Sequence, residues 1–213
     1  MDRPIDRLTG LISGVELSSD MEALIAQGAE FALLTIDIDM LSNINRDFGL
    51  KAGDAVFILI AEQIGKIFPQ PCVGYRGTRD EFEILMPGCC MEDAFLKGEE
   101  LRKLICEAKL DFRSAEGNPL RQTISIGVSD YPDNGNRPAD ILRRADSALM
   151  RAKKNGRNQV CLAREEKLIP KTSHYTQAQL EKLSLTAENE EVGEAVLLRE
   201  ALDDLLKKYD VDK

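Results

Sequence analysis

The sequence has no tryptophan and a single histidine, and aromatic residues make up only 5% of its 213 residues. With one histidine, a histidine-based catalytic triad or a metal site of several histidines is nearly excluded. His174 lies in the polar stretch KTSHYTQ, where we predict a solvated linker residue. Any chemistry must therefore depend on carboxylates, lysine and arginine.

Paired cysteines and long apolar runs are also missing. No C-x-x-C spacing occurs, so neither a zinc ribbon nor a disulfide framework is indicated, and we expect reduced, mostly buried thiols. The longest apolar run, AVFILIA at residues 55–61, is far shorter than the roughly 20 residues of a membrane span, and the N-terminus lacks the order of a secretory signal. These absences predict a cytoplasmic protein without a membrane segment. The five cysteines are Cys72, Cys89, Cys90, Cys106 and Cys161.

The net charge of the chain limits the kinds of partner that it can bind. A net charge of -9 argues against a general nucleic-acid surface, because duplex binding needs a basic face. We therefore predict no nucleic-acid partner, and any nucleotide ligand must be small and locally bound. Apolar residues at 43% and charged residues at 31% are typical of a globular domain.

Hydrophobic periodicity predicts interleaved strands and helices over residues 1–163, which is typical of an α/β (α+β) domain. Residues 164–213 are predicted to form a linker and a helical tail, since residues 165–213 carry 12 acidic and 7 basic residues and no strand-like segment. Leu198, Leu202, Leu205 and Tyr209 follow a heptad-like spacing, which fits either a helix packed on its own domain or a short coiled coil with a second chain. The predicted strands are 31–38, 72–77, 81–86, 121–132 and 158–163, and the predicted helices are 52–68, 91–109 and 138–156.

Four carboxylates are the first candidates for a site. Asp37 and Asp39 lie two apart on a predicted strand, so their side chains share a face, and Asp80 with Glu81 occupies the tip of a predicted hairpin. Carboxylates that converge at strand ends repel one another unless a cation holds them, and oxygen ligands suit Mg²⁺ or Mn²⁺. Such sites typically hold nucleoside triphosphates. By itself the acid pair is a weak signal, and a solvated strand end is its default interpretation.

Five segments, taken in order along the chain, strengthen the functional interpretation of these acids. They resemble the GGDEF family, the diguanylate cyclases, and the resemblance covers nearly all of the first 163 residues. It implies a nucleotidyl-cyclase-like, palm-like fold, in which a central mixed β-sheet is flanked by helices. The segments are DRLTGL (6–11), DIDMLSNINRDFGLKAGD (37–54), RGTRDEF (76–82), SIGV (125–128) and ADSALMRAKKNGRN (145–158).

The resemblance also implies roles for the acids. Asp37, the backbone carbonyl of Ile38 and Asp80 match the metal ligands of the family. Glu81 matches the residue that serves as a further ligand or as the catalytic base toward the ribose 3′-hydroxyl, so Asp80 and Glu81 are the candidate catalytic residues. The implied cofactor is Mg²⁺ or Mn²⁺.

Further matching positions imply substrate contacts. Asn45 and Asp54 match the residues that hydrogen-bond guanine, and both side chains offer the acceptors that its N–H groups require. Lys153 and Arg157 match the cations at the terminal phosphates, and we predict that they lie one helical turn apart on one helix face. The simpler reading of these two cations is a solvated last helix turn favoured by the macrodipole.

The signature itself departs from the family, because Thr78 and Arg79 replace its two glycines. Those glycines permit positive φ and leave room for the nucleotide. Gly77 and Thr78 fit the centre of a type II′ turn, which would withdraw Asp80 and Glu81 by one residue, roughly 3.3 Å. Alternatively the acids keep their place and Arg79 contacts the phosphates as an added cation. The sequence leaves both alternatives open.

Other departures affect the surroundings of the site. Leu41 and Ser42 replace the family's Phe-Lys, Arg46 replaces an Asp, and Leu50 replaces a His. The family's inhibitory R-x-x-D would fall on residues 69–72, which read PQPC. We therefore predict no site for product feedback.

The resemblance implies a domain that binds GTP with Mg²⁺ and condenses two GTP into cyclic di-GMP as a homodimer in bacterial signal transduction. The degenerate signature predicts weak or divergent activity at most. The alternative is a catalytically inactive GGDEF-like module that binds a nucleotide or a partner protein in regulation. A cyclase that acts on another nucleotide is a third interpretation, which the guanine-type residues Asn45 and Asp54 disfavour. An upstream sensor or partner protein is compatible with this sequence, which shows no sensor domain of its own.

Overall fold

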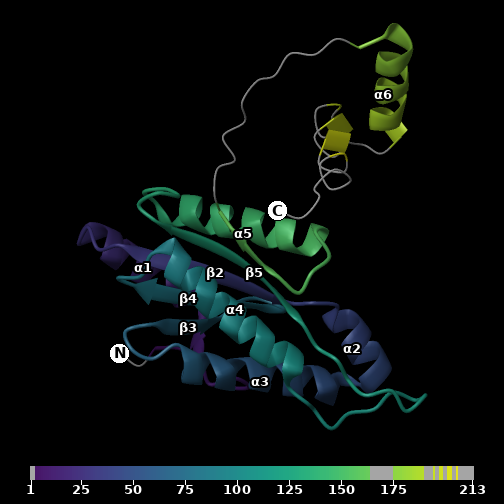
Figure 1. The fold of residues 1–213 in the computed structure, drawn as a ribbon. Coiled ribbons are helices and arrows are strands. Elements are labelled where there is room, and N and C mark those ends of the chain that lie inside the picture. The colour runs from purple at the N-terminus through teal and green to yellow at the C-terminus, as the bar shows by residue number, and fades with distance from the viewer. Residues whose placement is uncertain are drawn as a thin grey trace, which may run out of the picture. The chain divides into compact units, whose positions relative to one another are not determined.

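The computed structural model describes residues 3–163 and 175–189, together with residues 194, 197, 198, 201, 202 and 205. The chain divides into two compact units, Met1–Glu165 and Glu166–Lys213. In the second unit the structure describes one continuous helix, α6 (Gln177–Asn189), which is the C-terminal helical extension that we expected (Figure 1). The residues His174 and Tyr209 lie outside the described part of the chain.

The first unit is built on a six-stranded mixed sheet with the order β1-β3-β4-β2-β5-β6 (Figure 1). β1 runs parallel to β3 and β6 runs parallel to β5, whereas the three central pairings are antiparallel. The sheet is therefore mixed, as expected for a palm-like fold. The strands are β1 (Ile12–Ser13), β2 (Phe31–Ile38), β3 (Val73–Arg76), β4 (Glu81–Pro87), β5 (Ile124–Tyr131) and β6 (Val160–Leu162).

The strand β2 lies in the middle of the sheet, and every one of its residues is buried. Its sequence FALLTIDI is apolar almost throughout, as expected of a strand covered on both faces. Side chains alternate between the two faces: Leu34 and Ile36 belong to one core, and Phe31 and Leu33 belong to the other. This alternation puts Asp37 on the same face as Phe31 and Leu33.

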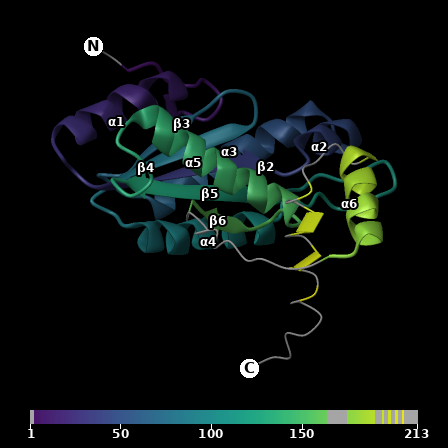
Figure 2. The ribbon, with the colours of Figure 1, turned by 90° about the horizontal axis from the view of Figure 1, so that it is seen from above.

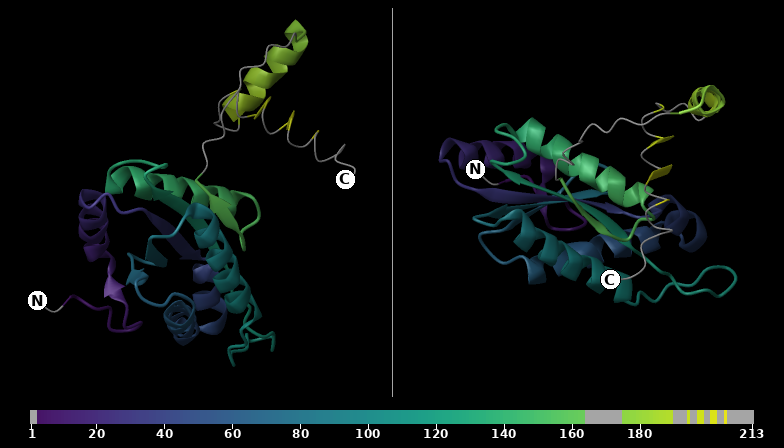
Figure 3. Two further views of the ribbon diagram at one scale, coloured as in Figure 1. Left: turned by 60° about the vertical axis from the view of Figure 1, so that its left-hand side comes forward. Right: turned by 45° about the horizontal axis from the view of Figure 1, so that its top comes forward.

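Helices cover both faces of the sheet. The helices α3 (Leu50–Ile67) and α4 (Met91–Glu107) pack on one face, and α1 (Leu17–Ala26) and α5 (Pro138–Lys154) pack on the other. Figure 3 shows α5 and α4 on opposite sides of the strands, and Figure 2 shows α5 lying along β5. Gly127 makes this close packing possible, because a Cβ at that position would lie 2.0 Å from the carbonyl oxygen of Ala145 on α5.

The predicted fold class is confirmed, with some changes in its elements. Two helices were not predicted, α1 and the short α2 (Leu41–Phe48) that follows β2. The helix predicted to begin at residue 52 begins at Leu50, and the helix predicted to reach residue 156 ends at Lys154. Among the described helices, none has the length and apolar character needed to cross a membrane.

Candidate functional site

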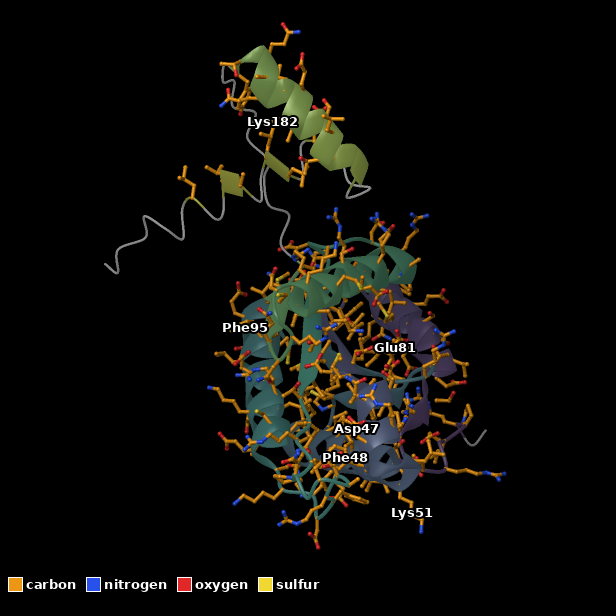
Figure 4. All side chains as sticks on the ribbon, turned by 90° about the vertical axis from the view of Figure 1, so that its right-hand side faces the viewer. Asp47, Phe48, Lys51, Glu81, Phe95 and Lys182 are labelled. Atoms are coloured by element: carbon orange, nitrogen blue, oxygen red, sulfur yellow. The ribbon has the colours of Figure 1, made fainter. Side chains whose placement is uncertain are left out.

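The candidate site lies where β2 ends and α2 begins. In the register of the sheet, Asp37 of β2 stands opposite Glu81 of β4 on one side and Ser125 of β5 on the other. The predicted hairpin acids and the predicted strand acids are thus neighbours in the sheet. Figure 4 views the domain from the side of α2, with Glu81 and the α2 residues Asp47 and Phe48 labelled.

Asp37 is 5% exposed, and its Oδ2 lies 2.7 Å from Nζ of Lys153 on α5. Burial raises the pKa of the Asp37 carboxyl group, Lys153 opposes that rise, and the charges of Asp80 and Asp39 add to it. Asp80 is therefore close enough for its charge to act on Asp37. A cation near these two carboxylates would relieve the repulsion, and the Lys153 ammonium supplies a positive charge on the Asp37 side.

Asp39 has a different role from the one that the acid pattern suggested. It is also 5% exposed, but its two carboxylate oxygens accept hydrogen bonds from the hydroxyls of Thr123 and Ser125, both at 2.7 Å, and from the Asn158 backbone N–H at 3.0 Å. These three donors already stabilise its charge. These hydrogen bonds tie β2 to the segments that flank it, and Asp39 was not among the predicted metal ligands.

The conformation of the hairpin loop excludes one of the two alternatives for the signature, the type II′ turn at Gly77 and Thr78. The Gly77 N–H donates to the Glu81 carbonyl at 3.0 Å, and the Glu81 N–H donates to the Thr78 carbonyl at 3.2 Å. Positive φ occurs at Arg79, at 58°, and not at Gly77. The turn thus centres on Arg79 and Asp80, so the proposed type II′ turn at Gly77 and Thr78 is wrong.

The acids accordingly stay at the hairpin tip. Glu81 is exposed and pairs directly with Asp37 in the register, and Asp80 is half-buried beside it. The Arg79 side chain is exposed at the tip of the loop. Its predicted contact with phosphates stays a prediction.

A second group of predicted residues lies on α2 and α3. Asn45 is on α2, and its Oδ1 is buried without a hydrogen-bond partner. This oxygen lies against Gly53 on α3, where a Cβ would come within 2.1 Å of it. Asp54 is the next residue and is exposed. The structure therefore places the predicted guanine-reading residues on two neighbouring helices, with the Asn45 amide oxygen buried and without a hydrogen-bond partner.

The predicted cations Lys153 and Arg157 do not share a helix face. The helix α5 ends at Lys154, and three consecutive residues, 156 to 158, then adopt positive φ. This left-handed turn reverses the chain so that the Asn158 N–H reaches Asp39. Arg157 is exposed in the turn, whereas Lys153 is partly buried against Asp37.

One acid in this region was missed by the sequence analysis. Glu83 of β4 stands opposite Thr35, on the same face as Glu81, and its Oε2 is buried without a partner. Burial raises the pKa of Glu83 to about 7, and the nearby charges of Glu81 and Asp146 on α5 add to the rise. With Arg76, both β4 acids line a cavity of about 260 Å³. The signal that was available is an ionisable residue inside an otherwise apolar strand.

The residues 69–72, which replace the family's inhibitory motif, line a mostly apolar cavity of about 520 Å³ with Ile67, Met86 and Leu96. They contain neither an arginine nor an aspartate. The prediction that this chain has no product-feedback site remains untested.

A divalent metal fits the donor atoms of the site. Asp37 and Asp80 supply two carboxylates, and Ile38, whose hydrocarbon side chain has no donor atom, can contribute only its backbone carbonyl. Oxygen donors of this kind suit Mg²⁺ or Mn²⁺. Within the described part of the chain, no three His, Cys, Asp or Glu side chains are grouped to hold a metal by themselves. The two carboxylates would need further oxygen ligands, such as phosphate or water.

Comparisons with known proteins agree with this geometry. The family described as "Diguanylate cyclase, GGDEF domain" matches residues 4–159. The uncharacterized protein YhcK of Bacillus subtilis is 30% identical over 166 residues, which cover 76% of this chain and 46% of YhcK. The diguanylate cyclase DgcP of Pseudomonas aeruginosa is 35% identical over 162 residues, which cover 74% of this chain and 24% of DgcP. The chain thus spans less than half the length of these relatives.

The fold is also found among solved structures. The GGDEF domain of DgcB from Caulobacter crescentus, determined in complex with c-di-GMP, superimposes with a TM-score of 0.67 at 26% sequence identity. The match covers 76% of this chain and 97% of that domain. The sheet and its covering helices are therefore those of an entire domain of this kind.

Proposed function

The chain belongs to the GGDEF family of diguanylate cyclase domains, and we propose from this premise that it binds GTP with Mg²⁺ or Mn²⁺. We further propose that two copies, each holding one GTP, face one another and condense the two nucleotides into cyclic di-GMP. The homodimer, the metal and the substrate are all parts of this proposal.

One observation carries the proposal: the buried, unpartnered Oδ1 of Asn45 beside Gly53 and Asp54. A buried acceptor without a partner is costly, and a ligand that donates a hydrogen bond there removes the cost. Guanine presents adjacent N1–H and N2–H₂ donors. The amide oxygen of Asn45 and the carboxylate of Asp54 are the acceptors that such an edge requires.

The triphosphate would lie toward the end of β2. Asp37, the Ile38 carbonyl and Asp80 would hold the metal, which when bound supplies positive charge to the phosphate oxygens. Lys153 is paired with Asp37 here and can turn to the terminal phosphates once that carboxylate has another cation. Arg157 is the second candidate cation for those phosphates.

In the proposed reaction the ribose 3′-oxygen of one GTP attacks the α-phosphorus of the other, and the bond to the leaving pyrophosphate breaks. Glu81 accepts the 3′-hydroxyl proton. The same exchange in the opposite direction closes the ring, so two GTP give one cyclic di-GMP and two pyrophosphates. Lys153, Arg157 and Arg79 neutralise charge on the departing pyrophosphate.

The test is incubation of the purified protein with GTP and Mg²⁺ or Mn²⁺, with products separated by chromatography. Asp80→Ala should abolish turnover, and Asp111→Ala, which removes an exposed acid elsewhere in the domain, should leave it unchanged. GTP binding is measured in parallel by calorimetry. Turnover that survives in Asp80→Ala would contradict the proposed role of Asp80.

A second candidate function is a catalytically silent module that binds a guanine nucleotide or a partner protein. It is favoured by Arg79, a non-glycine residue at φ 58° on the tip of the loop that carries the acids. This function predicts GTP binding that is lost in Asn45→Ala and no cyclic dinucleotide at any protein concentration. ATP in place of GTP tests whether a different nucleotide is the substrate.

A further inference from the structure

Arg76, the last residue of β3, binds the hairpin loop that follows it. Its Nη1 donates to the carbonyl of Gly77 at 3.0 Å and to that of Glu81 at 2.6 Å, and its Nη2 donates to the carbonyl of Arg79. One guanidinium therefore joins the first residue of the loop, its centre and the first residue of β4. The planar, forked geometry of arginine suits several acceptors at once.

The same guanidinium is held from the core side by two aromatic rings. Its central carbon lies 4.3 Å from the ring centre of Phe57 on α3 and 5.0 Å from that of Phe82 on β4. Both rings are buried, so they fix the position of the cation. Arg76 thus anchors the loop to α3 as well as to its own strands.

This anchoring matters because the loop adopts a conformation that its residues disfavour. Arg79 has φ of 58°, a region that glycine enters freely and that costs other residues free energy. Besides the bonds from Arg76, the backbone of the turn is held by two hydrogen bonds, from the N–H groups of Gly77 and Glu81. Asp80 and Glu81 lie in and directly after this strained turn.

We propose that Arg76 is a positioning residue that holds the glycine-poor hairpin in the conformation that keeps Asp80 and Glu81 beside Asp37. It acts through the carbonyls of the loop and touches no reacting atom. The proposal rests on the proposed function only for its effect on turnover, and its structural part can be measured without turnover.

The experiment is amide hydrogen exchange, followed by NMR, in the parent and in three variants. Arg76→Gln should speed exchange of the Gly77 and Glu81 amides by about tenfold or more, equivalent to about 1.4 kcal/mol of lost local stability. Arg76→Lys should behave like Arg76→Gln, because an ammonium cannot bind three carbonyls in one plane. Adding Arg79→Gly to Arg76→Gln should restore about tenfold of the protection, since glycine removes the strain at positive φ.

Arg113→Gln is the matched control. Arg113 also donates from Nη1 to a turn carbonyl, that of Gly117 at 3.1 Å, but in a loop elsewhere in the domain. Its replacement should leave exchange of the Glu81 amide unchanged. Amides of the core strand, such as that of Leu34, report whether any variant has lost the fold as a whole.

The results separate the two proposals. If the parent makes cyclic dinucleotide, Arg76→Gln should lower kcat by about tenfold or more and change the KM for GTP by a smaller factor, because Asn45 and Asp54 lie on other elements whereas the candidate metal ligand Asp80 lies in the loop. If the parent makes none while exchange responds as expected, the positioning role stands and the proposed reaction fails. Unchanged Glu81 exchange in Arg76→Gln, or full protection in Arg76→Lys, would overturn the positioning role.

Discussion

Glu83, whose carboxylate oxygen Oε2 is buried, should make the stability of this domain fall as the pH rises. It sits on β4 opposite Thr35, with Glu81, Asp146 and Arg76 as its charged neighbours, and its Oε2 has no hydrogen-bond partner. Burial, followed by those two carboxylates, raises its pKa from 4.5 to about 7. The native state therefore favours the protonated carboxyl group over the carboxylate.

The direction of this pH dependence follows from the number of protons bound in the native and in the unfolded state. Between pH 4.5 and pH 7 the native state holds the Glu83 proton and the unfolded state releases it, so stability falls with rising pH across that window. Each pKa unit corresponds to about 1.4 kcal/mol, which gives roughly 3 kcal/mol for the whole shift. Most of that loss, about 2.5 kcal/mol, falls between pH 5 and pH 8.

The assay is urea unfolding at several pH values from 5 to 8, in the presence of a chelator. Glu83→Gln keeps the shape of the side chain and removes its titration, so the variant should lose roughly 2 to 3 kcal/mol less stability than the parent over this range. Asp130→Asn is the control for the method: burial, followed by the charge of Asp133, raises the pKa of Asp130 to about 6, so its effect should be complete at a lower pH.

Identical pH dependence of stability in the parent and in Glu83→Gln would refute this reasoning. So would a difference that grows toward low pH, because that would require a lowered pKa of Glu83 in the native state.

Two further predictions concern the candidate site. Gly53→Ala should raise the KM for GTP at least about tenfold and destabilise the domain by more than about 1 kcal/mol, because the new Cβ would lie 2.1 Å from the Asn45 oxygen and displace it. The control is Gly65→Ala on the same helix. Its new Cβ meets nothing within 4 Å, so it should stabilise the domain by about 1 kcal/mol in the same urea assay. Lys153→Met should raise the pKa of Asp37 further, because it removes the cation at 2.7 Å from a buried carboxylate. The measurement is a carboxyl NMR titration without metal. An unchanged titration would show that the ion pair does not form in solution.

Much of the fold could be read from local sequence. The continuous apolar run of residues 31–38 predicted a fully covered strand, and β2 is the central strand with both neighbours antiparallel. The helix α5 was predicted from its initial proline and its lysine-rich last turn. The helices α1 and α2 were missed although each carries apolar residues at helical spacing, such as Leu17, Met21 and Leu24 on α1. With ten and eight residues, these helices have stripes of only two to three turns.

The ordered motifs determined the family and, through it, a list of candidate residues. What each residue contacts depended on elements far apart in the chain. Asp37 and Asp39 are equivalent in sequence terms, yet one faces Lys153 and the other is bound by Thr123, Ser125 and Asn158. No local pattern separates them, because their partners come from segments more than 80 residues away.

By itself the sequence determined alternating strands and helices with acids at strand ends and, through the family resemblance, a mixed sheet flanked by helices, since apolar periodicity and short motifs are local properties. Tertiary structure alone decided that the hairpin turns at Arg79 and that Arg157 leaves the helix of Lys153. Both outcomes involve backbone conformations that are unfavourable in isolation. In the folded domain, hydrogen bonds from distant or flanking side chains and backbone groups stabilise these conformations.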